Sequence, residues 1–190
     1  MFTATLGLAL VHKGTSISFK RAGDDMGRRE DLSRLCENVT AALALISGLA
    51  DEDCQSFQEY VAARSLPRTT EEQKVLRDVA MQVAILRATR VPLASASSIY
   101  GALGHAEMAL RLSDRHLLSD VFGGALIMQA ASKAVLLAVK ANVSLLTDAG
   151  VRAEIEGDLL ELERLSSARS ESVTRAYEAR MADSKDFAGQ

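Results

Sequence analysis

Apolar residues recur along the chain at spacings of three and four, the spacing of one face of an α-helix. Residues that form turns interrupt this pattern at a few places, so it predicts long helices joined by short connections. The expected helices cover residues 2–20, 27–65, 70–90, 92–112, 119–146 and 148–182. Pro92 either starts a new helix or kinks a continuing one, so the helices number five or six. We therefore expect an all-α fold, an elongated helical bundle.

The composition supports this fold class. The chain has 190 residues, of which 48% are apolar and 25% charged, a normal balance for one globular domain. Two prolines and 4% aromatic residues are too few for the many turns and strands of a β-sandwich or β-barrel. We expect one helical domain over 1–182 and a frayed tail over 183–190. The net charge of −3 gives no basic surface for binding nucleic acid.

Neither a membrane nor an oxidising compartment is indicated. No basic stretch precedes the apolar run at 2–11, so we interpret it as a buried helix rather than a secretion signal. The most apolar segment, 121–139, contains Lys133, and its uncharged part is shorter than the roughly 20 residues of a membrane span. Cys36 and Cys54 form neither a disulfide framework nor a zinc motif. We expect a soluble cytoplasmic protein with no membrane partner.

One acidic residue lies on the apolar seam of the second expected helix. The seam consists of Leu32, Leu35, Val39, Leu43, Ile46, Ala50, Asp53, Phe57 and Tyr60 or Val61. A carboxylate buried there costs free energy unless it is paired, hydrogen-bonded or protonated. Either the helix bends or ends nearby and Asp53 is solvated, or Asp53 is a buried acid with a raised pKa. The second case would suit a general acid or base.

The expected helix 119–146 is apolar nearly all round and rich in Gly and Ala, so we place it centrally, with close neighbours or a second subunit. Ser119 and Asp120 are typical of its N-terminus, although Asp120 could equally be catalytic. Lys133 and Lys140 share one face, where they either extend to solvent or line a cleft for an anion. Asn142 lies near the other end of this helix.

Motifs for other chemistry are missing. His12, His105 and His116 do not pair at ligand spacing with each other or with cysteine, so we expect no metal site. The sequence has no phosphate-binding loop, dinucleotide fingerprint or serine-nucleophile motif. From the residues alone, the chain is a soluble helical bundle with one unusually placed acid.

Several short segments form a pattern when they are taken together. They are Asp51-Glu-Asp-Cys-Gln-Ser-Phe57, Leu66-Pro-Arg-Thr-Thr-Glu-Glu72, Gln82, Val91-Pro-Leu93, Ser119-Asp120, Asn142 and Leu145-Leu-Thr-Asp148. In combination they resemble the cyclodeaminase/cyclohydrolase family over roughly residues 4–180. This family includes the cyclodeaminase domain of formiminotransferase-cyclodeaminase and the bacterial methenyltetrahydrofolate cyclohydrolases.

The resemblance implies a helical homodimer that binds a reduced folate in a cleft near the subunit interface. It places the catalytic acid, the second Asp of an Asp-x-Asp-x-x-x-Phe segment, on Asp53. It also carries the family's Ser-Asp pair onto Ser119 and Asp120 and its late Asn onto Asn142. The folate is the substrate, and no cofactor is implied.

Further candidates follow from this substrate. A folate carries a glutamate tail, for which Lys20, Arg21, Lys133 or Lys140 could supply cations. His116 stands where the family has a Gly-Asn-x-Asn turn, and is either a new acid/base group near Asp120 or an exposed turn residue.

Three functions remain open at this point. The chain is a folate cyclodeaminase or cyclohydrolase, or it has the same fold and acts on a non-folate amidine or imine. The family's Pro-Gly-Gly-Gly-Ser loop does not precede the first helix, which motivates the second reading; either the sequence is truncated or this member lacks the loop. The third function is a non-catalytic dimeric scaffold, which predicts a salt-bridged Asp53.

Overall fold

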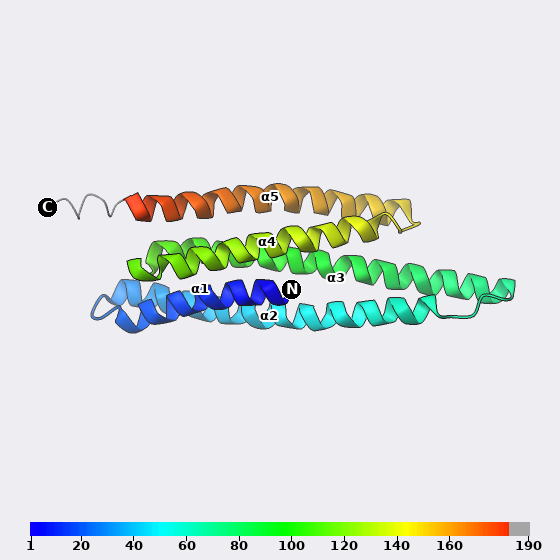
Figure 1. Cartoon of the computed structure of the whole chain (residues 1–190), viewed down its shortest axis with the longest axis horizontal. Helices are drawn as coiled ribbons and strands as arrows, with labels where there is room; N and C mark the ends of the chain where they lie inside the picture. The colour runs from blue at the N-terminus through cyan, green and yellow to red at the C-terminus, as the bar shows by residue number, and fades with distance from the viewer. Residues whose placement is uncertain (183–190) are drawn as a thin grey trace.

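The computed structural model describes residues 1–182, and within them all regular structure is helical (Figure 1). The elements are α1 (Phe2–Arg21), α2 (Met26–Arg64), α3 (Glu71–Leu112), the 3₁₀ turn η1 (Arg115–Leu117), α4 (Leu118–Val143) and α5 (Ala149–Ala182). They lie side by side along one long axis, so the expected elongated all-α bundle is confirmed. The frayed tail predicted for 183–190 lies outside the described residues.

Side chains at the helix starts explain several boundaries. The Thr70 hydroxyl accepts from the Gln73 backbone N–H, and the Gln73 side chain accepts from the Thr70 backbone N–H, a capping box at the predicted position. Asp148 caps α5 by accepting from the backbone N–H groups of Gly150 and Val151 at 2.8 and 3.0 Å. The prediction for α4, residues 119–146, differs from the structure by one residue at the start and three at the end. The helix begins at Leu118 without a side-chain cap, so Ser119 lies inside its first turn, and it ends at Val143.

Pro92 does not divide α3, which runs unbroken from Glu71 to Leu112. The bundle therefore has five α-helices within residues 1–182, the lower of the two expected numbers. Because proline has no backbone N–H, the carbonyl four residues earlier, at Ala88, loses its usual helical donor. The Ala88 carbonyl oxygen therefore needs a hydrogen-bond donor from elsewhere.

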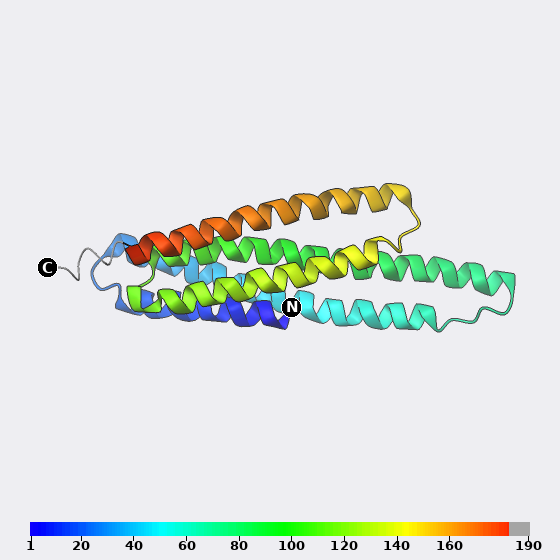
Figure 2. The same ribbon diagram turned by 45° about the horizontal axis from the view of Figure 1, so that its top comes forward.

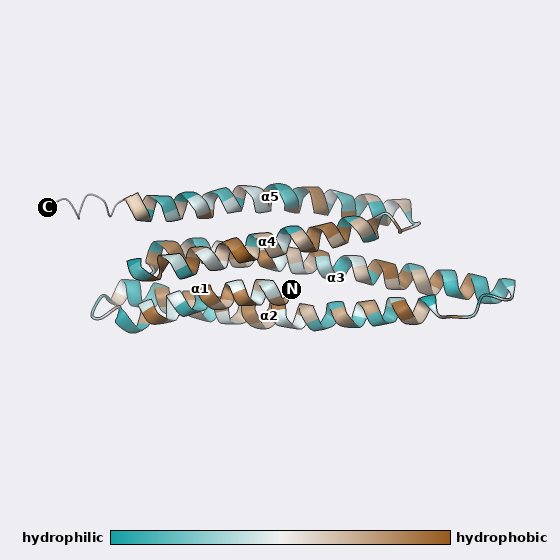
Figure 3. Cartoon of the chain, viewed as in Figure 1, coloured by the Kyte–Doolittle hydropathy of each residue, from teal (hydrophilic) through white to brown (hydrophobic). Residues whose placement is uncertain are grey.

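The core divides into two clusters along the bundle. The first contains residues of all five helices and includes Leu8, Leu35, Leu103 and Met128. The second is built from α3, α4 and α5, around Val139 and Ile155. Hydropathy follows this packing, because α4 is largely hydrophobic and α5 largely hydrophilic (Figure 3).

α3, which packs against all four other helices, is the central helix, so the prediction that α4 is central was wrong. Small residues nevertheless let α1 approach α4 closely. A Cβ atom added to Gly7 would lie 2.5 Å from the Gly124 carbonyl oxygen, and one added to Gly124 would lie 2.3 Å from the Gly7 carbonyl oxygen. By length and composition the segment Arg115–Val143 could also cross a membrane. In the bundle it packs against α1, α3 and α5, so its apolar character is accounted for by its place in the core.

The first helix covers only part of the second. The amino terminus lies near the middle of the long axis, and the α2–α3 hairpin continues well beyond it (Figure 2). The predicted seam is buried at Leu32, Val39 and Ala50, but Phe57 is 64% exposed. The seam therefore does not stay buried to its end, because no α1 residue is available to cover α2 beyond its midpoint. Asp53 lies where this cover ends.

Candidate active site

Asp53 lies half-buried on α2, where two adjoining cavities meet. The first, of about 340 Å³, is lined by Met1, Thr3, Asp53, Pro92, Ala130, Ala131, Ala134, Val135 and Ala138. The second, of about 250 Å³, is lined by Asp53, Ser56, Phe57, Tyr60, Ile85, Ala88, Pro92, Ala138, Asn142 and Leu145. Asp53, Pro92 and Ala138 belong to both cavities, so the carboxyl group borders a hollow formed by α1, α2, α3 and α4.

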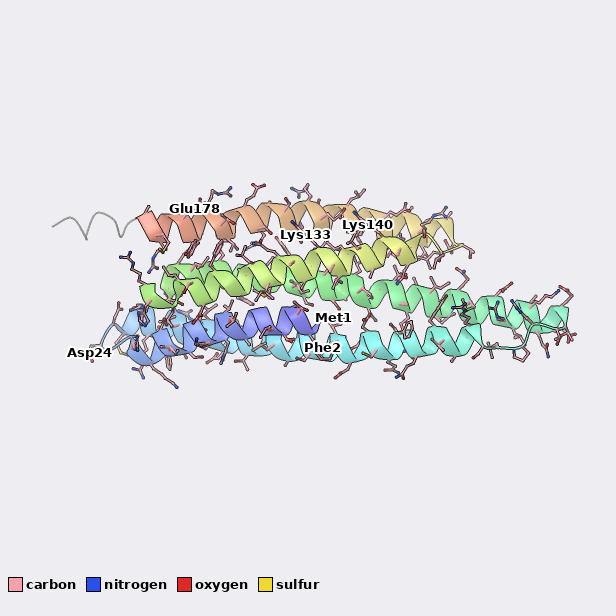
Figure 4. The ribbon with its side chains drawn as sticks, in the orientation of Figure 1. Met1, Phe2, Asp24, Lys133, Lys140 and Glu178 are labelled. Atoms are coloured by element: carbon pink, nitrogen blue, oxygen red, sulfur yellow. The ribbon has the colours of Figure 1, made fainter. Side chains whose placement is uncertain are left out.

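The Asp53 carboxylate has neither an ion pair nor a hydrogen-bonding side chain among residues 1–182. Burial raises the pKa of this carboxyl group above its ordinary value, and the positive amino terminus of Met1 opposes the shift. Met1 begins α1 beside α2 (Figure 4), and its sulfur accepts a hydrogen bond from the Ser95 hydroxyl at 2.9 Å. α2 continues past Asp53 to Arg64, so the helix does not end there to release the side chain to solvent.

Asn142, onto which the resemblance carried the family's late Asn, lies in the same hollow, and the structure gives it a definite contact. Its Nδ2 donates to the Ala88 carbonyl oxygen at 2.8 Å. This is the carbonyl that Pro92 deprives of its helical donor, so the Asn142 amide replaces the missing backbone N–H. Asn142 thus ties α4 to α3 at the wall of the smaller cavity.

Ser56, Tyr60 and Pro92 were not selected from the sequence, although all three line the site. Ser56 and Tyr60 follow Asp53 by three and seven residues, a spacing that places them on one helix face and could have identified them. The Ser56 hydroxyl donates to the Asp53 backbone carbonyl at 2.9 Å. Pro92 belongs to the Val91-Pro-Leu93 segment that carries the family resemblance, but the pairing of α3 with α2 that brings it to the site could not be predicted from spacing.

A second group of predicted residues lies at the opposite end of α4. Asp120 and Asn142 are separated by about 33 Å at the rise of an α-helix. Asp120 forms an ion pair with Lys13 at 2.7 Å. His116 is exposed and contacts Arg21 rather than Asp120. Ser119 and Lys20 are exposed at the same end, so within one chain these residues do not meet Asp53.

Lys133 and Lys140 lie on the side of α4 that faces α5 (Figure 4). The Lys140 ammonium pairs with Glu163 of α5 at 2.6 Å. Neither lysine lines the two cavities at Asp53. No group of three or more His, Cys, Asp or Glu residues in 1–182 is arranged to hold a metal ion.

Known relatives cover most of the chain. A methenyltetrahydrofolate cyclohydrolase of Methylorubrum extorquens is 29% identical over 148 residues, which are 78% of this chain and 70% of that protein. A formimidoyltransferase-cyclodeaminase of Sus scrofa is 28% identical over 183 residues, 92% of this chain; the match spans only 31% of the pig protein. The crystal structure of a formiminotetrahydrofolate cyclodeaminase from Thermotoga maritima shares the fold, with a TM-score of 0.79, at 19% identity. That comparison covers 94% of this chain and 84% of the other.

The sequence model of the formiminotransferase-cyclodeaminases matches residues 2–161, which include α1 to α4, the first part of α5 and, apart from Met1, every residue that lines the two cavities at Asp53. This chain belongs to the formiminotransferase-cyclodeaminase family.

Proposed function

We propose that this protein acts on a reduced folate in one-carbon metabolism, as a formiminotetrahydrofolate cyclodeaminase or a methenyltetrahydrofolate cyclohydrolase. The observation that carries the proposal is the unpaired, half-buried carboxylate of Asp53 at the junction of two cavities. Both activities are named among the relatives. A raised pKa brings a carboxyl group closer to neutral pH, where it can both accept and return a proton.

In the cyclodeaminase reaction, N10 of the folate attacks the amidine carbon carried on N5. A C–N bond forms, a five-membered ring closes, and the bond to the amidine nitrogen breaks to release ammonia. Asp53 would take the proton from N10 and deliver a proton to the departing nitrogen. A single positioned carboxyl group therefore suffices for the proton transfers.

In the cyclohydrolase reaction, water adds to the methenyl carbon and one ring C–N bond breaks, which leaves a formyl group on nitrogen. Asp53 would take a proton from the attacking water and return it to the nitrogen that leaves the carbon, while the second water proton is released to solvent as the formyl carbonyl forms. In both reactions the folate is the substrate, and the proposal includes no cofactor.

The other predicted site residues have two different roles in this proposal. Asn142 would position the wall of the hollow through its bond to Ala88. Ser119, Asp120, His116, Lys20 and Arg21 would reach a substrate at Asp53 only from a second copy of the chain. We propose a cytoplasmic homodimer in which this happens, because the α2–α3 hairpin leaves large apolar side chains uncovered.

Replacement of the carboxyl group tests the proposal. We expect Asp53→Asn to lower turnover of formimino- or methenyltetrahydrofolate by about 100-fold or more, the range of general acid–base catalysis. Asp51→Asn is the matched control, because Asp51 lies two residues away on the exposed face of α2. Formation or loss of the methenyl ring, followed by its absorbance, measures the rate.

Two outcomes would contradict the proposal. Full turnover by Asp53→Asn would remove the acid/base role, while failure of the unaltered protein to bind folinate in calorimetry would favour a non-folate amidine or imine. The scaffold reading predicts a salt-bridged Asp53, whereas the Asp53 carboxylate has no ion pair within residues 1–182.

A further inference from the structure

A separate cavity of about 340 Å³ lies between α4 and α5, on the side of α4 turned away from Asp53. It is lined by Leu103, Gln129, Ser132, Lys133, Leu136, Leu137, Glu163, Ser166, Ser167 and Ser170. None of these residues lines the two cavities at Asp53. The catalytic proposal therefore leaves this cavity unexplained.

Buried polar atoms without partners gather around this cavity. Among residues 1–182, the buried side-chain atoms that lack a hydrogen bond are Ser113 Oγ, Gln129 Nε2, Ser132 Oγ and Ser166 Oγ. The last three belong to residues of this one cavity, and Ser132 is only 2% exposed. Buried polar groups in folded proteins are nearly always satisfied by protein, ligand or water, so such a cluster marks a polar site within the cavity.

The charges at the cavity favour an anion. Lys133 forms no ion pair with any described side chain. The carboxylate of Glu163 is already paired with Lys140 at 2.6 Å. An amide N–H₂, serine hydroxyls and a free ammonium therefore face the cavity as donors.

The walls indicate the rest of the ligand. Leu103, Leu136 and Leu137 supply an apolar surface, and a few convergent polar groups on such walls are the usual composition of a small-molecule site. Neutral donors with one lysine match a single negative charge better than a doubly charged phosphate.

We propose that this cavity binds a small organic monocarboxylate with an apolar body. The carboxylate accepts from the hydroxyls of Ser132 and Ser166, from the Gln129 amide and from the Lys133 ammonium. The apolar body packs against the leucines. This site is independent of Asp53 and stands whether or not the chain turns over a folate.

Benzoate and its neutral isostere benzamide are suitable probes, titrated into the full chain and followed by amide chemical shifts. Benzoate should bind saturably and shift the resonances of Gln129, Ser132 and Ser166. Benzamide should bind about fivefold or more weakly, because it lacks the charge. Lys133→Met should weaken benzoate about fivefold, while Lys74→Met, which removes the same charge at the far hairpin, should not.

Ser132→Ala separates binding from folding. It should weaken benzoate without lowering the melting temperature, since the hydroxyl it removes is unsatisfied in the free protein. The proposal would be overturned if benzoate showed no saturable binding up to about 20 mM, because small-molecule sites bind their ligands at far lower concentrations. Equal binding of benzamide, equal effects of the two lysine variants, or shifts confined to the residues around Asp53 would also overturn it.

Discussion

At the scale of single residues, the burial of Asp53 links its protonation to folding. Burial raises the pKa of this carboxyl group in the folded chain, so the protonated form stabilises the fold. That stabilisation is fully present below the unfolded value of 3.8 and is lost as the pH rises through the folded pKa. Asp53→Asn should therefore raise the free energy of unfolding at neutral pH and change it least in acid.

Urea unfolding at a series of pH values measures this difference, with Asp51→Asn as the control on the exposed side of α2. A variant that becomes less stable as the pH rises, relative to the unaltered chain, would show that Asp53 is stabilised in its charged form. The burial argument would then be wrong.

Asn142 and Pro92 should be energetically coupled through the Ala88 carbonyl. Asn142→Leu removes the donor at 2.8 Å and should cost about 1–2 kcal/mol of unfolding free energy, because the carbonyl is then left unsatisfied. Pro92→Ala restores a backbone N–H to that carbonyl. In this background Asn142→Leu should cost about 1 kcal/mol less, which a double-mutant cycle measures. Strict additivity of the two changes would contradict the replacement of the N–H by the amide.

Spacing alone singled out Asp53 as an acid on a periodic apolar seam, because that evidence is local, whereas its catalytic role was implied only by the family resemblance. The contacts of Asp120 and His116 could not be predicted in this way. Their partners, Lys13 and Arg21, are more than 90 residues away along the chain. Which residues share a cavity depends on how the helices are paired, and neither spacing nor composition specifies that pairing.

At the scale of helices, the contact between α1 and α4 depends on glycine. Gly7→Ala should destabilise the protein by about 1–3 kcal/mol, because the new Cβ would lie 2.5 Å from the Gly124 carbonyl oxygen, a backbone atom. Gly48→Ala on α2 is the matched control, since nothing lies within 4 Å of its Cβ. It should stabilise by about 0.5–1 kcal/mol through helix propensity. Thermal unfolding of both variants checks the pair, and equal effects would contradict the close approach.

The start of α3 was predicted from a side-chain signal. Thr70 was predicted to cap the start of this helix, and in the structure it is the residue that caps α3. The sequence left open whether Pro92 starts a new helix or lies within a continuing one. The helix can continue because the hydrogen bond that proline removes is replaced by a donor from another helix, here Asn142. The exposure of Phe57 on the apolar seam has a related reason: periodicity identifies the face of a helix, but not how far a neighbouring helix covers it.

At the scale of the whole molecule, the helices differ in length, and the difference leaves an apolar surface. Beyond the amino terminus of α1, α4 and α5 still accompany the α2–α3 hairpin for part of its length, and the hairpin then continues without them (Figure 1). Large exposed apolar side chains on this hairpin are Phe57, Val61, Leu66, Val75, Leu76, Val79 and Val83. A soluble monomer rarely leaves so many apolar side chains together in water, so the surface favours association.

If the proposed homodimer forms through this surface, charge placed on it should disrupt the dimer. The double variant Val79→Glu/Val83→Glu alters residues that are 60% and 66% exposed, so the single chain should still fold. We expect it to sediment as a monomer where the unaltered chain sediments as a dimer, because a charge buried without a partner in an interface is strongly unfavourable. Leu160→Glu, which is 67% exposed on α5, should remain dimeric.

Because residues at the far end of α4 lie about 33 Å from Asn142 within one chain, loss of the dimer should also lower folate turnover if they act across the interface. A monomeric but fully active variant would confine the catalytic site to the hollow at Asp53.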